Sequence, residues 1–154
     1  RVMNLIRYCF FFFFSLLWTF IIFLPPSLAE EALRKQKPFR VGCILYLTGD
    51  LAMQENAFRE GLEIARDEIL QAGGIGGRPL ELIVEDTKND PKLGVNASQK
   101  FLSVDKIDAA LLSSYQDAMS SGPLYEAAKI PAIVLWDASP EIDAAGDFLF
   151  SIGP

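Results

Sequence analysis

The sequence predicts an α/β fold, a doubly wound parallel sheet flanked by helices. Short, nearly continuous apolar runs alternate along the chain with longer stretches whose apolar residues recur at the period of a helix. The runs lack the in-out alternation of half-exposed strands, which is typical of parallel strands buried on both faces. Glycine, proline and helix-capping residues stand where one kind of segment gives way to the other. This alternation indicates right-handed β-α-β crossovers within one sheet.

The first β-α unit opens the predicted domain. Residues 39–47 form an almost uninterrupted apolar run, predicted to be a strand, which ends at the polar turn 48–50. A helix is predicted over 55–72, where six apolar or small residues fall on one stripe: Phe58, Gly61, Leu62, Ala65, Ile69 and Ala72. Gly73 and Gly74 follow the helix, and glycine is favoured there because it adopts the left-handed conformation without strain.

The second unit begins with a predicted strand at 80–85. Asp90 is expected to cap the next helix, whose first residue is Pro91. Proline suits that position because its missing N–H would have no partner within the helix. The buried stripe of this helix is expected to hold four apolar residues: Leu93, Ala97, Phe101 and Val104.

The remaining segments continue the alternation. They are, in chain order, a strand at 108–113, a helix at 116–129 bent near Gly122-Pro123, a strand at 131–136, one helical turn at 140–145 and a strand at 147–152. In a sheet of this kind, ligands bind beyond the carboxyl ends of the strands. The loops that follow Leu47, Ser113 and Trp136 are therefore expected to converge on one wall of a cleft.

The first 29 residues are predicted to form a secretory signal peptide that is cleaved after Ala29. Two arginines precede an apolar, uncharged run at 8–24, and small residues stand before the cut. The alternative is a retained membrane anchor, because the apolar run is at the short limit for a membrane span. Residues 30–38 are charged and expected to form an exposed lead-in to a single domain over 39–154.

Composition excludes several kinds of site. The chain has 14 basic and 20 acidic residues, and its net charge of −6 disfavours nucleic acid and anionic membranes as partners. It contains no histidine, which excludes histidine-based catalytic triads and most zinc sites. Cys43 is the one cysteine after the predicted cleavage point, and its place in an apolar strand indicates a buried thiol. No metal or cofactor is expected.

Six segments follow one another in an order that is typical of one family. They are the first strand with its Thr48-Gly49 loop at 41–49, the helix segment 59–65, the glycine-rich run 72–82, the acidic turn 84–91, the helix end 125–131 and Ser139-Pro140-Glu141. Through these segments, the mature sequence resembles the periplasmic leucine/isoleucine/valine-binding proteins, the solute-binding components of branched-chain amino acid importers. The resemblance covers residues 39–154 and implies a lobe of the type I periplasmic-binding-protein fold.

The resemblance implies a function as well as a fold. Proteins of this family hold a small solute between two similar lobes that close about a hinge, and they deliver it to the permease of an ABC importer. The chain is therefore expected to be a periplasmic, non-enzymatic protein that captures an amino acid or a similar small polar ligand. Residues 148–154 resemble the segment that enters the crossing between the lobes, so the second lobe is expected to lie outside this sequence.

Two other functions stay open at this point. A sensory ligand-binding domain of a receptor would share the same lobe. An exported enzyme on a similar sheet is the third possibility, and the absence of histidine and of a nucleophile motif disfavours it.

The resemblance also implies where the ligand binds. Its loops supply seven candidate ligand-binding residues: Gln54, Ser114, Tyr115, Gln116, Asp137, Ala138 and Ser139. Ser114 precedes a predicted helix, where free N–H groups and the helix dipole favour a carboxylate. Asp137 would accept from an ammonium or hydroxyl group, and Ser139 would donate to a carboxylate.

Each of these assignments has a plainer alternative. Ser114 would then only cap its helix, Asp137 and Ser139 would only cap the turn before Pro140, and Tyr115 would only line the cleft wall. The chain also departs from the family at three places: at Gln54-Glu55, where an aromatic residue followed by glycine is common, at 135–137 and at Tyr115. These departures favour a ligand that is larger or more polar than leucine.

Overall fold

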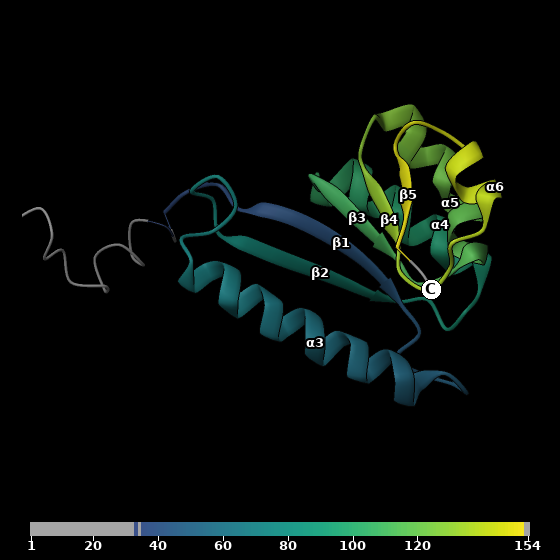
Figure 1. The fold of residues 1–154 in the computed structure, drawn as a ribbon, viewed down its shortest axis with the longest axis horizontal. Helices are drawn as coiled ribbons and strands as arrows, with labels where there is room; N and C mark the ends of the chain where they lie inside the picture. The colour runs from purple at the N-terminus through teal and green to yellow at the C-terminus, as the bar shows by residue number, and fades with distance from the viewer. Residues whose placement is uncertain (1–32, 34, 153–154) are drawn as a thin grey trace, which may run out of the picture.

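Five parallel strands form one sheet in the order β2-β1-β3-β4-β5 (Figure 1). The strands are β1 (Phe39–Leu45), β2 (Leu80–Asp86), β3 (Ala109–Leu112), β4 (Ala132–Val134) and β5 (Leu149–Ser151). The computed structural model describes residue 33 and residues 35–152, so the predicted signal peptide lies outside the described residues. The doubly wound parallel sheet that the sequence predicts is confirmed, although β3, β4 and β5 are shorter than expected.

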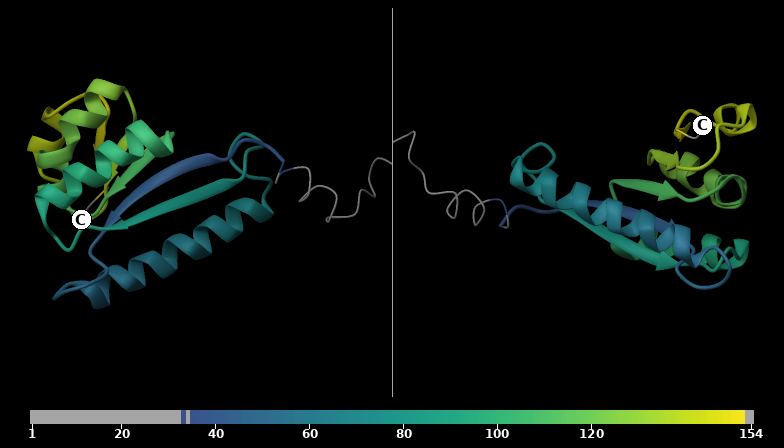
Figure 2. Two further views of the ribbon diagram at one scale, coloured as in Figure 1. Left: turned by 180° about the vertical axis from the view of Figure 1, so that it is seen from behind. Right: turned by 60° about the horizontal axis from the view of Figure 1, so that its bottom comes forward.

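Helices cover both faces of the sheet. They are α3 (Ala52–Gln71), α4 (Pro91–Lys100), α5 (Tyr115–Ala128) and α6 (Pro140–Ala144), and a π-helix, η1 (Phe101–Asp105), continues α4. Figures 1 and 2 show α3 running alongside β1 and β2, away from α4, α5 and α6. The chain moves from β1 outward to β2 and then back past β1 to β3, and right-handed crossovers in opposite directions place their helices on opposite faces. No helix within residues 35–152 is long and apolar enough to span a bilayer.

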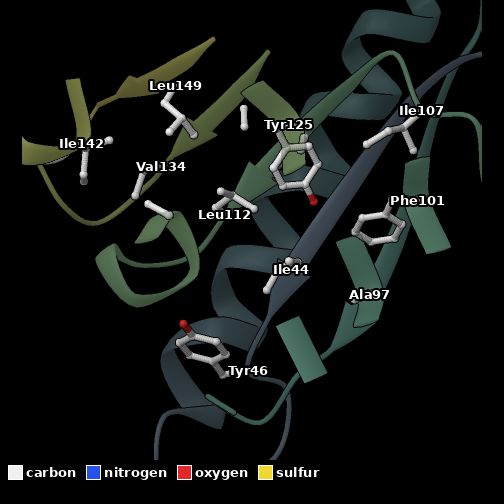
Figure 3. Close-up of a cluster of buried hydrophobic side chains, with 13 residues drawn as sticks. Ile44, Tyr46, Ala97, Phe101, Ile107, Leu112, Tyr125, Val134, Ile142 and Leu149 are labelled. Atoms are coloured by element: carbon white, nitrogen blue, oxygen red, sulfur yellow. The ribbon is translucent and has the colours of Figure 1, made fainter. Parts of the chain in front are cut away.

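The sheet separates two apolar clusters. The larger cluster joins Ile44, Leu112 and Val134 of the sheet to Phe101 and Tyr125 of the helical layer (Figure 3). The smaller cluster lies under α3 and is built from alternate residues of β1, including Cys43, whose thiol is fully buried as expected. Neighbouring residues of β1 thus pack into the two clusters in alternation. This is the geometry of a strand that is covered on both faces.

The buried stripe of α4 differs from the expected one. Ala97 and Phe101 are buried as predicted, but Leu93 is 39% exposed and Val104 is 69% exposed. Gly94 and Ser98 take the inward positions instead, because small side chains let α5 approach closely. The hydroxyl of Tyr125 on α5 donates to Ser98 Oγ at 2.8 Å. After Phe101 the chain becomes a π-helix, whose wider turn breaks the 3.6-residue period on which the stripe was based.

The first helix also differs from the prediction at one end. It begins at Ala52, three residues before the expected start, and its one buried residue is Glu55. Phe58, Leu62 and Ile69 are partly buried, whereas the small residues of the predicted stripe are exposed. The glycine ending is confirmed: Gly73 and Gly74 have φ of +95° and +78°. Asp90 likewise caps α4 as predicted, since its carboxylate accepts from Lys92 N at 2.8 Å.

Arg78 links the segments that precede β1 and β3 at the amino edge of the sheet. Its guanidinium donates two hydrogen bonds to Asp108, at 3.2 and 2.7 Å, and a third to Pro38 O at 2.6 Å. Asp108 also accepts from Arg40 N at 2.9 Å. Partial burial acts to raise the pKa of Asp108, but Arg78 and the Arg40 amide outweigh it and hold the pKa below its ordinary value. This edge is therefore a structural ion-pair network, at the opposite end of the strands from the expected ligand loops.

Candidate functional site

The carboxyl edge of the sheet holds the topological switch point, between β1 and β3. Here β1 continues into α3 on one face of the sheet and β3 continues into α5 on the other face, so the two connections diverge. Ligands in open α/β sheets bind at such a point, because the diverging loops leave a crevice beyond the strand ends. The loops after β1, β3 and β4 all begin at this edge, because every strand pair is parallel.

Tyr46 joins the tip of β1 to the start of α5. Its hydroxyl donates to Asp117 Oδ2 at 2.5 Å and shares a 2.6 Å hydrogen bond with Ser114 Oγ. Ser114 caps α5, because its Oγ accepts from Asp117 N at 3.4 Å. In Figure 3, Tyr46 lies just past the end of β1, at one end of the apolar cluster beyond Ile44. The apolar face of the sheet therefore ends in a small hydrogen-bonded network directly beneath the β3–α5 loop.

Glu55 makes a second connection between the same two loops. Its Oε1 accepts from Ser113 Oγ at 2.7 Å and its Oε2 accepts from Tyr46 N at 3.2 Å. The side chain lies in the first turn of α3 and is only 4% exposed. A carboxylate in this position satisfies two donors that directly follow β1 and β3, which explains why a residue with two acceptor oxygens is the one buried side chain of α3.

The tip of β4 meets α3 one turn further along. The rings of Phe58 and Trp136 lie with their centroids 5.3 Å apart and their planes at 50°. Aromatic pairs in such tilted arrangements are mutually attractive. Together with Tyr46 and Glu55, this contact brings the tips after β1, β3 and β4 around the first two turns of α3. The predicted convergence of the three tips is confirmed.

The predicted residues of the β3–α5 loop occupy the start of α5. Tyr115 and Gln116 are its first two residues and both are exposed. Ser114 is half-buried, and its hydroxyl is engaged with Tyr46 and with the Asp117 amide. Ser114 therefore acts as a helix cap, the plainer of the two expectations, and its contact with a ligand stays a prediction.

The β4–α6 loop is organised around Asp137. Its Oδ1 accepts from Ser139 N at 2.7 Å and also from the hydroxyl of Ser139. Ser139 precedes Pro140 at the start of α6, and Ala138 between them is exposed. The loop is thus folded on itself in the manner of an Asx turn, and the ligand-binding role of its three residues stays a prediction.

Gln54 does not lie in the first loop, which corrects its expected position. Because α3 begins at Ala52, Gln54 belongs to the first turn of the helix, where it is exposed. The loop itself is held by Asp86 at the end of β2, which accepts from Leu47 N at 3.0 Å and from Thr48 Oγ1 at 2.7 Å. Burial acts to raise the pKa of Asp86, but these hydrogen bonds and one from Lys88 outweigh it and lower the pKa.

Burial is the largest influence on the pKa values of Asp117 and Tyr46. It raises the pKa of Asp117 to about 6, even though hydrogen bonds from Tyr46 and Ser114 favour the ionised form, and the carboxylate of Glu55 raises it further. Burial also raises the pKa of Tyr46, so the phenol stays protonated and acts as a donor. Among the described residues, no group of three or more Asp, Glu, Cys or His side chains is arranged to hold a metal ion.

One depression lies beside this edge without including any predicted ligand residue. It has a volume of about 400 Å³ and lies between α4 and α5, where Pro91, Lys92, Val95, Asn96 and Ser120 line it. It is wide open to solvent, in contrast to the enclosed site that a small solute requires.

Comparison with known proteins decides the family. Residues 38–154 match the family described as periplasmic binding protein. The chain belongs to the periplasmic binding protein family. Among its curated relatives is the Leu/Ile/Val-binding protein BraC3 of Rhizobium johnstonii, which is 38% identical over 60 residues. That match covers 39% of this chain and 16% of the relative.

Solved structures of the family share the fold. The isoleucine complex of the branched-chain amino acid binding protein LivJ from Streptococcus pneumoniae matches with a TM-score of 0.69 at 23% identity. A solute-binding protein from Rhodopseudomonas palustris, in complex with 3,4-dihydroxy benzoic acid, matches with a TM-score of 0.68 at 21% identity. Each match covers 75% of this chain and 33% of the solved chain. The predicted type I lobe is confirmed, and the chain spans about a third of the length of these periplasmic binding proteins.

Sequence reasoning missed the roles of Tyr46, Glu55 and Asp117. A signal existed for one of them: Ser114 and Asp117 have the spacing of a helix capping box, which places an acidic residue next to the cap. Tyr46 and Glu55 gave no such signal, because their partners are distant along the chain and only the strand order brings them together.

Proposed function

We propose that this chain forms one lobe of a periplasmic solute-binding protein, which captures a small solute with a carboxylate group for an ABC importer and catalyses no reaction. The observation that carries the proposal is the meeting of the tips after β1, β3 and β4 at the switch point of the sheet. Membership of the periplasmic binding protein family supports the same role.

A carboxylate fits the start of α5. The first intrahelical hydrogen bond runs from Ala118 N to Ser114 O, so the amides before it lack helical partners. Ser114 Oγ occupies the Asp117 amide, which leaves those of Tyr115 and Gln116 at an exposed helix start. Two such N–H groups, reinforced by the helix dipole, favour a bound anion.

Two classes of solute follow from the side chains around this position. Tyr115 and Trp136 are exposed at the same edge and would contact either an aliphatic side chain or an aromatic ring. Asp137 would accept from an ammonium or a phenolic hydroxyl group. Similar solved proteins hold isoleucine in one case and 3,4-dihydroxy benzoic acid in another, and both solutes carry a carboxylate. We therefore propose α-amino acids and hydroxylated aromatic acids as the two classes to test.

Substitutions at Tyr115 test the amide contact directly. Tyr115→Pro removes the first N–H of α5 without straining the backbone, since proline is favoured at the first helical position and Ser114 is already extended, with φ −142° and ψ 170°. Tyr115→Ala removes the same ring but keeps the N–H. Solute-observed NMR titrations with isoleucine and with 3,4-dihydroxybenzoate would compare the two variants.

We expect Tyr115→Pro to bind the preferred solute about fivefold more weakly than Tyr115→Ala, because only the proline variant lacks the donor. Equal affinities in the two variants would contradict the amide contact. One lobe buries only part of a solute, so the chain alone is expected to bind in the millimolar range. Micromolar affinity of the chain alone in calorimetry would contradict closure between two lobes.

A further inference from the structure

We propose that Asp117 is a positioning residue: its ionised carboxylate, acting through Tyr46 and Ser114, holds the β3–α5 loop in the geometry that receives the solute, and protonation releases the loop without unfolding the lobe. This inference rests on the proposed function for its last step, the effect on solute binding. The loop geometry itself is independent of any solute.

The placement of Asp117 exceeds what a helix cap requires. The carboxylate is 2% exposed, although a residue of a helix start at the surface is ordinarily solvated. Its Oδ2 accepts the Tyr46 hydroxyl at 2.5 Å, a contact between elements 71 residues apart in the sequence. Hydrogen bonds to an ionised acceptor are about twice as strong as those between neutral groups. The charge on Asp117 therefore strengthens one of the two hydrogen bonds that tie the start of α5 to Tyr46 at the tip of β1.

The groups around Asp117 come from three parts of the fold: the end of β1, α3, and α5 with its cap. Tyr46 at the end of β1 and Ser114 at the start of α5 donate or share hydrogen bonds, while Glu55 of α3 adds a second negative charge. Tyr125 of α5 is a further titratable group that senses the charge of Asp117. No ion pair of the described residues includes Asp117 or Glu55. The carboxylate is thus ionised against both burial and a neighbouring charge.

The second carboxylate oxygen of Asp117, Oδ1, lies near Gly94 of α4, as does the hydroxyl of Ser121. A Cβ added to Gly94 of α4 would lie 3.3 Å from Asp117 Oδ1 and 3.6 Å from Ser121 Oγ, so both oxygens face the same small space. Ser121 Oγ is fully buried and has no hydrogen-bond partner among the described residues. When Oδ1 carries the proton, Oδ2 accepts from Tyr46 only as a neutral carbonyl oxygen, and the hydrogen bond is weaker.

Protonation of Asp117 is therefore expected to increase the global stability of the lobe and, at the same time, to loosen the β3–α5 loop. The pKa of Asp117 is raised to about 6, so the neutral form favours the folded state and global stability increases as the pH falls through this value. The bond from Tyr46 weakens over the same range, so the loop loosens. A purely structural role would move both properties together.

The test follows the amide NMR resonances of residues 113–117 in the full chain, without solute, between about pH 5 and pH 7.5. We expect them to titrate together near pH 6 in the wild type and not to titrate in Asp117→Asn. In Tyr46→Phe the shifts of Tyr115 and Gln116 are expected to resemble the low-pH wild type at every pH. Asp90→Asn is the matched control, since Asp90 caps α4 without a tyrosine partner, and it should leave the titration unchanged.

The same samples separate this inference from the proposed function. With isoleucine and 3,4-dihydroxybenzoate as probes, affinity for the preferred solute is expected to fall at least threefold from pH 7.5 to pH 5 in the wild type, and to be flat in Asp117→Asn. Absence of the loop titration, or its persistence in Asp117→Asn, would overturn the positioning role. A loop titration without binding of either probe would support the positioning and contradict the proposed function instead.

Discussion

At the residue scale, the site is built around two buried carboxylates that no ion pair of the described residues neutralises. Asp117 and Glu55 are held instead by hydroxyl and amide donors from Tyr46, Ser113 and Ser114. At Asp117, burial outweighs these donors and raises the pKa of the carboxyl group to about 6. Asp86 and Asp108, which are less buried, have lowered pKa values and contribute stability at neutral pH. Ionisation of Asp117 therefore opposes folding.

The contribution of Asp117 to the free energy of unfolding depends on pH and can be measured. Its pKa of about 6 in the folded state lies above the ordinary value near 4, so the folded state binds its proton more tightly than the unfolded state. Its contribution to the free energy of unfolding therefore decreases as the pH rises from about 4 to about 6, by up to about 3 kcal/mol. Urea unfolding of the wild type and of Asp117→Asn at several pH values isolates this contribution as the difference between the two proteins. A difference that is constant with pH would contradict the buried charge.

Cys43 gives an independent test of burial in the smaller cluster. Burial raises the pKa of its thiol to about 12, so the reactive thiolate is scarce at neutral pH and the sulfur is also shielded. In a Cys9→Ser variant, Cys43 is the one thiol of the chain. We expect it to react with an aromatic disulfide reagent at least a hundredfold more slowly in the native protein than in denaturant. Comparable rates in the two conditions would show that the cluster under α3 opens.

At the element scale, close packing between β1 and the helical layer depends on a glycine. Gly42 faces Phe101, and a Cβ at position 42 would approach the ring to 2.6 Å. Phe101 is fully buried where α4 becomes η1, so it cannot move outward freely. Gly61 of α3 differs, since a Cβ there would meet nothing within 4 Å. The two glycines thus have opposite consequences for the same substitution.

We expect Gly42→Ala to lower the free energy of unfolding by about 1–3 kcal/mol, the usual cost of overpacking a core. Gly61→Ala is the matched control and should raise it by about 0.5–1 kcal/mol, because alanine restricts the unfolded chain and favours the helix. Denaturant unfolding measures both. If Gly42→Ala were as stable as the wild type, Phe101 would have to be more loosely packed than the structure indicates.

Some features of the individual helices are determined by the local sequence, and others are not. Caps and glycine endings are local, so Asp90, Pro91 and the Gly73-Gly74 ending were predictable. The buried stripe of α4 was only partly predictable, because the choice of Gly94 and Ser98 over Leu93 reflects the proximity of α5. The early start of α3 was missed since Glu55 becomes a buried residue only when Tyr46 and Ser113 supply its donors.

At the scale of the whole molecule, the two faces of the sheet are covered unequally. On the face opposite α4 and α5, α3 covers β1 and β2, and burial declines across the sheet from the fully buried Cys43 to Phe150 of β5, which is 49% exposed. Ile152 is 65% exposed. Within the described residues this leaves an apolar strip along β5, where the face lacks a helix.

The uncovered strip is expected to bind apolar dyes. Phe150→Lys should lower the fluorescence of a bound naphthalene sulfonate dye at least twofold, because it places a charge within the strip. Val104→Lys is the matched control, since Val104 is equally apolar and more exposed but lies on η1, away from this strip. An equal decrease in both variants would show that the dye reports general surface apolarity.

The sequence predicted which loops form the candidate site, but it did not predict the side-chain contacts between those loops. Strand ends marked by Thr48, Ser114 and Asp137 identified the loops, because the order of β and α segments fixes which edge of a parallel sheet they share. The connections among those loops depend on strand neighbours that the sequence does not state, so Tyr46–Asp117 and Phe58–Trp136 emerged only from the fold. Gln54 was misplaced for the same reason.

The central claim is that solute meets the lobe at the meeting point of the tips after β1, β3 and β4. Backbone amide NMR of the labelled chain, titrated with isoleucine and with 3,4-dihydroxybenzoate, tests it most directly. The account predicts that the largest shift changes for the bound solute fall on residues 46–49, 113–117 and 136–139 together. Changes confined to the amino edge around Arg78 and Asp108, or to the depression lined by Lys92 and Ser120, would contradict it.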